Sequence, residues 1–105
     1  MGKEEYIRIL KKFKEKLKGK IKVEKMILFG SRAVGDNRKD SDIDLLIVSS
    51  SFNGKNFFDR VKKMYNYWDL DYAVDFLCYT PEEFEKLSKK ISIVTEALKT
   101  GVEIK

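Results

Sequence analysis

The stretch LFGSRAVGDNRKDSDIDLLIV, residues 28–48, decides the fold of this chain. An apolar run ends at Gly30, a polar loop follows, and Ser41-Asp42-Ile43-Asp44 begins a second apolar run. The second run is typical of a buried strand, where ionised carboxylates such as those of Asp42 and Asp44 are costly to place. The two aspartates therefore need an explanation other than packing.

Alternation along a strand places Asp42 and Asp44 on the same face, with their Cα atoms roughly 6.5 Å apart. The residues around them divide in the same way: Leu46 and Val48 share the face of the carboxylates, and Ile43, Leu45 and Ile47 form the other face. Two carboxylates this close repel each other unless one keeps a proton or a cation lies between them. Ligands that are all carboxylates suit Mg²⁺ or Mn²⁺.

The rest of the chain predicts helices that alternate with strands. Apolar residues spaced three and four apart predict helices over residues 4–18 and 56–67. Short apolar runs predict strands over 26–29, 41–48 and 72–79. Strands that alternate with helices imply an α/β or α+β layer fold with a single sheet.

The C-terminal third begins with a strong helix-start signal. Thr80 is the expected N-cap, Pro81 occupies the first helical position and Glu83 completes a capping box. The helical pattern continues, with a break near Ile91-Ser92, and residues 102–104 predict a short edge strand. With no linker or repeat in the sequence, residues 1–105 are predicted to form one domain.

Asp75 is a third acidic residue in the middle of an apolar strand. If that strand lies beside the strand of Asp42 and Asp44, the three carboxylates can hold two metal ions roughly 3.5–4 Å apart, which suits in-line attack on phosphorus. Gly30 would let the backbone approach a phosphate closely, and the Ser31 hydroxyl would add a hydrogen bond.

Each of these pieces alone has an ordinary explanation. The two aspartates could lie in water at the end of a strand, Gly30-Ser31 could be a simple turn, and Asp75 could cap a turn or pair with a lysine. The combination of all three in this order is far more specific.

Composition excludes several kinds of chemistry. The chain has no histidine and one cysteine, which excludes zinc sites built from those residues, histidine acid–base catalysis and an internal disulfide. No apolar run approaches the roughly 18 residues of a membrane span, and the N-terminus lacks the apolar segment of a secretory signal. A cytoplasmic location without membrane contact is therefore expected.

The net charge of +5 is concentrated near the N-terminus. Residues 1–25 carry ten Lys and Arg against four Glu, whereas residues 26–105 carry twelve basic and thirteen acidic residues. The basic N-terminal helix is interpreted as a solvated face. A contact with RNA is the alternative.

The segment GSRAVGDNRKDSDIDLLIV, residues 30–48, resembles the signature of the nucleotidyltransferase superfamily with a DNA-polymerase-beta-like palm. More narrowly, the chain resembles the minimal nucleotidyltransferases of archaea and bacteria, which include antitoxins. Two further segments share this resemblance: AVDFLCYTPEEF, residues 73–84, and VTEALKTGVEI, residues 94–104. It implies an α+β fold, a small mixed sheet of the palm type with helices packed on it.

The resemblance also implies roles for individual residues. Asp42, Asp44 and Asp75 would be catalytic and would hold Mg²⁺ or Mn²⁺, two ions in all, with Asp75 helping to deprotonate the acceptor hydroxyl. The residues expected to bind the nucleotide are Gly30, Ser31, Arg32 and Ser41. Minimal members often carry a second arginine in this motif, where the present chain has Val34. Arg38 and Lys39 in the loop are expected to be solvated.

The implied activity is transfer of AMP from ATP to a hydroxyl, in the resembling systems a tyrosine of a helical HEPN toxin that the enzyme neutralises. One alternative is a non-catalytic palm module that binds the toxin, and another is nucleotide addition to RNA or to a small hydroxyl compound. A homo-oligomer is left open.

Aromatic residues crowd residues 52–72. Most are expected in the core, and a surplus of exposed rings would mark a contact patch for a partner. The residues concerned are Phe52, Phe57, Phe58, Tyr65, Tyr67, Trp68 and Tyr72.

Overall fold

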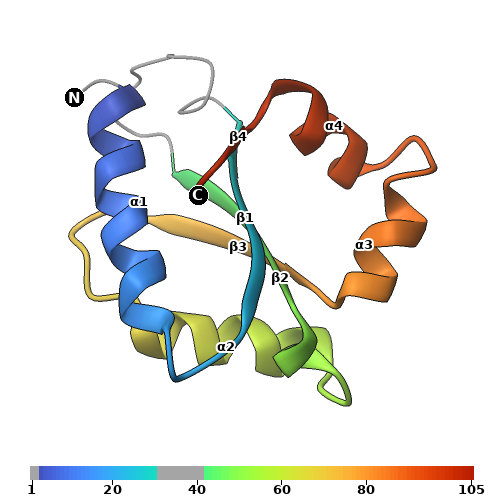
Figure 1. The fold of residues 1–105 in the computed structure, drawn as a ribbon, viewed down its shortest axis with the longest axis horizontal. Helices are drawn as coiled ribbons and strands as arrows, with labels where there is room; N and C mark the ends of the chain where they lie inside the picture. Colours follow the sequence, from blue (N-terminus) through green and yellow to red (C-terminus); the bar gives the residue numbers. More distant parts are fainter. Residues whose placement is uncertain (1–2, 31–41) are drawn as a thin grey trace.

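The computed structural model describes residues 3–30 and 42–105. The predictions that concern Ser31, Arg32, Ser41 and the residues between them lie outside the described residues. The elements follow in the order α1 (Lys3–Leu17), β1 (Val23–Phe29), β2 (Ile43–Ser49), the 3₁₀ turn η1 (Ser50–Phe52), α2 (Phe57–Tyr67), β3 (Val74–Tyr79), α3 (Pro81–Leu87), α4 (Ile93–Thr100) and β4 (Val102–Glu103) (Figure 1).

The four strands form one mixed sheet in the order β3-β2-β1-β4. β1 pairs antiparallel with both β2 and β4, whereas β2 and β3 run parallel. The parallel pair needs a crossover connection, and α2 supplies it. The α+β class with a small mixed sheet, expected from the sequence, is confirmed.

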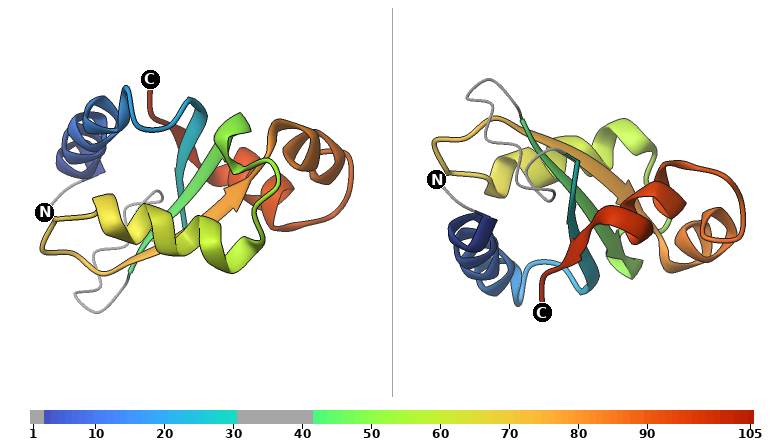
Figure 2. Two further views of the ribbon diagram at one scale, coloured as in Figure 1. Left: turned by 90° about the horizontal axis from the view of Figure 1, so that it is seen from below. Right: turned by 90° about the horizontal axis from the view of Figure 1, so that it is seen from above.

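Helices cover both faces of the sheet (Figure 2). On one face, α1 and α2 enclose the larger core, which includes Ile43, Leu45 and Ile47 of β2. On the other face, α3 and α4 cover a smaller core that includes Leu46 and Val48. The predicted division of β2 into two faces is therefore confirmed, and the carboxylate face is the one that α3 and α4 cover in part.

The predicted boundaries differ from the structure where pairing between distant segments decides them. β1 extends back to Val23, because its first residues find partners at Val48 and Ser49 in β2. The predicted break in the C-terminal helix separates α3 from α4, and Ser92 caps α4 through a capping box with Thr95. Among the described residues, the helices are all too short or too polar to cross a bilayer.

The free edge of β3 is covered by side chains of α2. β3 ends the sheet, so one of its edges has no neighbouring strand. The Tyr65 hydroxyl donates a hydrogen bond to the Val74 carbonyl, and the Arg60 guanidinium donates one to the Cys78 carbonyl at 3.2 Å. These bonds satisfy edge carbonyls that could otherwise recruit a strand of another chain.

Arg60 joins three elements, and its loss is expected to destabilise the fold. It is only 7% exposed and binds both carboxylate oxygens of Glu83, at 2.6 and 3.2 Å, as well as the Lys55 carbonyl. Arg60→Met removes the donor that these acceptors share and leaves Glu83 without its counter-charge, which should lower the free energy of unfolding by about 2–3 kcal/mol. Urea denaturation measures the change.

The matched control for Arg60 is Lys89→Met, which breaks the exposed pair between Lys89 and Glu85. An exposed pair of this kind contributes about 0.5 kcal/mol or less. Equal unfolding midpoints for the two variants would show that the buried contacts of Arg60 do not stabilise the fold more than an exposed ion pair does.

Candidate active site

At one end of the sheet β1 stops and β2 and β3 begin (Figure 1). Asp42, Asp44 and Asp75 all lie at this end. Asp44 is paired with Phe29 of β1 on one side and with Asp75 of β3 on the other. Asp42 lies immediately before β2. The expectation that the strand of Asp75 lies beside the strand of the other two aspartates is therefore confirmed.

Gly30 brings the main chain of β1 against the carboxylate of Asp44. Its φ of +75° lies in the left-handed region, which residues with a side chain rarely adopt. A Cβ atom built at this position would overlap the Asp44 carboxylate and would lie 3.1 Å from its Cγ. A residue with a side chain at position 30 would therefore have to adopt a strained backbone conformation and displace the Asp44 carboxylate.

Burial and, after it, mutual repulsion raise the pKa of two of the aspartates. Partial burial raises the pKa of Asp44, and the charges of Asp75 and Asp42 raise it further. Desolvation, the charge of Asp42 and a hydrogen bond with Asp42 raise the pKa of Asp75. Because a hydrogen bond between two carboxyl groups requires a proton on one of them, the cluster favours an added proton or another positive charge.

The donor set fits a hard divalent cation in its chemistry. Its ligand atoms are all carboxylate oxygens, which Mg²⁺ and Mn²⁺ prefer, and a cation would relieve the repulsion that adds to the effect of burial on the two pKa values. Within residues 3–30 and 42–105, no three His, Cys, Asp or Glu side chains converge closely enough to form a ready-made metal site. Holding an ion with all three aspartates would therefore require side-chain rotation.

Tyr65 borders the cluster, which the sequence did not indicate. Its hydroxyl donates to the carbonyl of Val74, the residue before Asp75. Burial, together with the charges of Asp75, Asp42 and Cys78, raises the pKa of this tyrosine. The aromatic residues of this segment were expected mostly in the core; the ring of Tyr65 makes an edge-to-face contact with Phe76, but the residue is 44% exposed. The helical spacing of α2 carried no signal that the hydroxyl reaches the start of β3.

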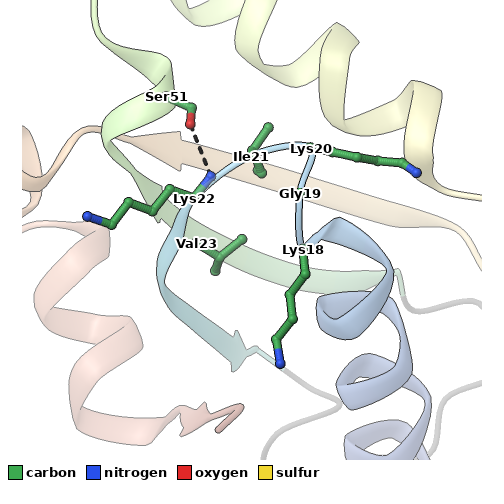
Figure 3. A pocket seen from close by; sticks show the side chains of 7 residues that line it. All are labelled: Lys18, Gly19, Lys20, Ile21, Lys22, Val23 and Ser51. Atoms are coloured by element: carbon green, nitrogen blue, oxygen red, sulfur yellow. Dashed lines mark hydrogen bonds between the residues drawn. The ribbon is translucent and has the colours of Figure 1, made fainter.

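A hollow lined by three lysines lies at the opposite end of the sheet (Figure 3). It measures about 500 Å³ and is formed by the turn between α1 and β1 together with Ser51, whose hydroxyl accepts a hydrogen bond from the Lys22 N–H. The side chains of Lys18, Lys20 and Lys22 point in three different directions (Figure 3). They do not enclose a common point, and the RNA contact of the N-terminal region stays a prediction.

Comparison with known proteins identifies the family. The family model of the nucleotidyltransferase domain matches residues 8–100. A Haemophilus influenzae protein named "Probable protein adenylyltransferase MntA" is 35% identical over 77 residues, covering 71% of this chain and 68% of the relative. A Methanocaldococcus jannaschii protein named as a "putative protein adenylyltransferase" is 31% identical over 102 residues, covering 95% of this chain and 99% of the relative.

A solved structure supports the fold independently. The crystal structure of a "putative nucleotidyltransferase" from Sulfolobus solfataricus superimposes with a TM-score of 0.67 and covers 96% of this chain and 80% of its own. At 24% sequence identity, this similarity concerns the fold alone. Since the family model spans nearly the whole chain and the curated relatives carry the same kind of name, the chain belongs to the nucleotidyltransferase domain family and is a nucleotidyltransferase of the minimal type.

Proposed function

We propose that this enzyme transfers AMP from ATP to a hydroxyl group of a partner protein, a tyrosine of a small helical HEPN protein, and that it thereby acts as an antitoxin. The observation that carries the proposal is the cluster of Asp42, Asp44 and Asp75 against Gly30 at one end of the sheet. The curated relatives support the acceptor class, because both are named as protein adenylyltransferases.

Asp42, Asp44 and Asp75 are the residues that would hold Mg²⁺ or Mn²⁺, two ions in all. When bound, such ions supply positive charge that stabilises the attacking and leaving oxygens of an in-line displacement. The glycine at position 30 keeps the backbone open beside Asp44, so that a phosphate could approach it closely. Ser31, Arg32 and Ser41 remain the predicted partners of the triphosphate.

Asp75 is suited to the acceptor side of the reaction. It is exposed at the start of the edge strand, where a hydroxyl from another molecule could reach it. Its raised pKa increases its ability to accept a proton. In the proposed step, the acceptor oxygen bonds to the α-phosphorus of ATP, the bond to the bridging oxygen breaks, pyrophosphate leaves and the acceptor proton passes to Asp75.

Exposed aromatic rings favour a protein as the acceptor. The sequence left open whether the aromatics of residues 52–72 are all core, and the structure leaves Phe57 44% and Phe58 74% exposed at the start of α2. A surplus of exposed rings is typical of protein contact surfaces. An ATP-dependent reaction on a protein agrees with the cytoplasmic location expected from the sequence.

The decisive experiment incubates the chain with ATP labelled in its α-phosphate, Mg²⁺ and the helical protein encoded beside it. We expect the label on a tyrosine of that protein, located by mass spectrometry. An Asp75→Asn variant should still bind the partner but leave it unlabelled. A partner inhibited by the parent enzyme without acquiring label would mean that the chain acts by binding alone, and label on RNA would identify a different acceptor.

A further inference from the structure

An apolar groove of about 290 Å³ lies where α3 and the start of α2 flank the end of β3. Its lining residues are Phe57, Tyr79, Glu83, Lys86, Leu87 and Lys90. The ring of Phe57 lies against that of Tyr79, with centroids 5.9 Å apart, and Phe58 beside it is largely exposed. Large apolar side chains therefore gather at this place without being covered by the described part of the chain.

The ion pair of Arg60 and Glu83 lies at the wall of the groove, which Glu83 lines. This pair ties α2 to α3, and Glu83 also accepts a hydrogen bond from the Thr80 N–H at 2.8 Å, which fixes the start of α3. Contacts within the fold thus fix the position of Glu83 in the wall of the groove. A preformed groove requires little ordering when a partner binds.

The rim of the groove is positive. Arg60 neutralises Glu83, so the net charge of the rim comes from Lys86 and Lys90. Neither lysine forms an ion pair with any residue in the described ranges, whereas Lys89 between them pairs with Glu85. An apolar floor with a positive rim is complementary to an amphipathic helix that carries acidic residues beside its apolar face.

The groove and the aspartate cluster share one face of β3. Asp75 and Tyr79 are four residues apart on the same strand, so their side chains point to the same side, separated by about 13 Å along the strand. A protein that docks in the groove would thus be separated from Asp75 by less than the length of β3.

We propose that this groove is the docking site for the acceptor protein, which inserts an acidic amphipathic helix between α2 and α3. The inference rests on the proposed function for the identity of that protein. A second copy of the chain is a poorer occupant, because a symmetric contact through this groove would bring the lysines of one copy against those of the other.

The test measures binding of the adjacent-encoded helical protein by calorimetry, without ATP or Mg²⁺. The variant Lys86→Glu/Lys90→Glu is compared with Lys11→Glu/Lys12→Glu on α1, which changes the net charge equally at exposed positions away from the groove. We expect the groove variant to bind at least about tenfold more weakly and the control to stay within about twofold of the parent. Phe57→Ser should also weaken binding, and melting temperatures verify that all variants fold.

Equal affinities for the parent, both lysine variants and Phe57→Ser would overturn the docking proposal. A change in the oligomeric state of the isolated chain on groove substitution would also overturn it, because a second copy would then be the occupant. At saturating partner, the groove variant should still transfer AMP. If the complex with the parent chain transfers no AMP, the proposed function fails. The binding result would still stand, because binding is measured without nucleotide.

Discussion

Replacing Asp44 with asparagine is expected to abolish nucleotidyl transfer while leaving the protein at least as stable as its parent. Asp44 lies between Gly30 and Asp75, and its replacement removes the central carboxylate of the cluster. Removing one preorganised charged group at a reacting centre lowers the rate by about 10²–10³-fold. A metal ligand in the same position would be lost with it.

The stability of Asp44→Asn follows from the raised pKa of the parent carboxyl. A folded-state pKa above the ordinary aspartate value of 3.8 means that the folded protein holds its proton more tightly than the unfolded chain. The parent therefore loses stability as the pH rises through 3.8 towards the raised folded value. The asparagine variant does not titrate at this position and escapes that loss.

Two measurements separate these effects. Melting temperatures without divalent cations should be nearly equal for the parent and Asp44→Asn below pH 3.8, and the variant should melt at the same temperature or higher at pH 7. Added Mn²⁺ should raise the melting temperature of the parent more than that of the variant. Asp71→Asn, at an exposed position outside the cluster, serves as the control. A metal-free variant that melts well below the parent at pH 7 would contradict the repulsion described here.

Gly30→Ala is expected to remove activity through a steric effect on Asp44. The new Cβ would overlap the Asp44 carboxylate, which must then move. Displacement of a catalytic group by about 1 Å can lower the rate about a hundredfold. The left-handed φ of +75° adds a backbone penalty of about 1–2 kcal/mol to the folded state.

Gly54→Ala is a matched control for the backbone penalty. Its φ of +78° is close to that of Gly30, and a Cβ there would meet no atom within 4 Å. Both variants should lose a similar amount of stability in urea denaturation, but only Gly30→Ala should lose transfer activity. If Gly54→Ala were equally inactive, strain in the backbone and not the contact with Asp44 would explain the loss.

Much of the candidate site could be predicted from local sequence. Side chains alternate along any strand, so the common face of Asp42 and Asp44 follows from their spacing alone. The capping box of Thr80 and Glu83 and the division of β2 into two faces were likewise predicted and confirmed. The resemblance to nucleotidyltransferases rested on the sequence of residues 30–48, 73–84 and 94–104, and the family comparison confirmed it.

The contacts between distant segments required the tertiary structure. The sequence could place Asp75 in a strand but not opposite Asp44, because the register of two strands depends on pairing across the whole sheet. The close approach of Gly30, at the end of β1, to the Asp44 side chain in β2 is also a contact between distant segments.

Exposure was also decided by packing. Phe52 and Phe57 belong to one aromatic-rich segment, yet Phe52 is fully buried and Phe57 lines an open groove. The sequence thus determined which chemical groups share a face of each strand or helix. Residues two apart share a face of a strand, and residues three or four apart share a face of a helix. Only the folded chain determined which faces meet, because that choice depends on how all the elements bury their apolar surface together.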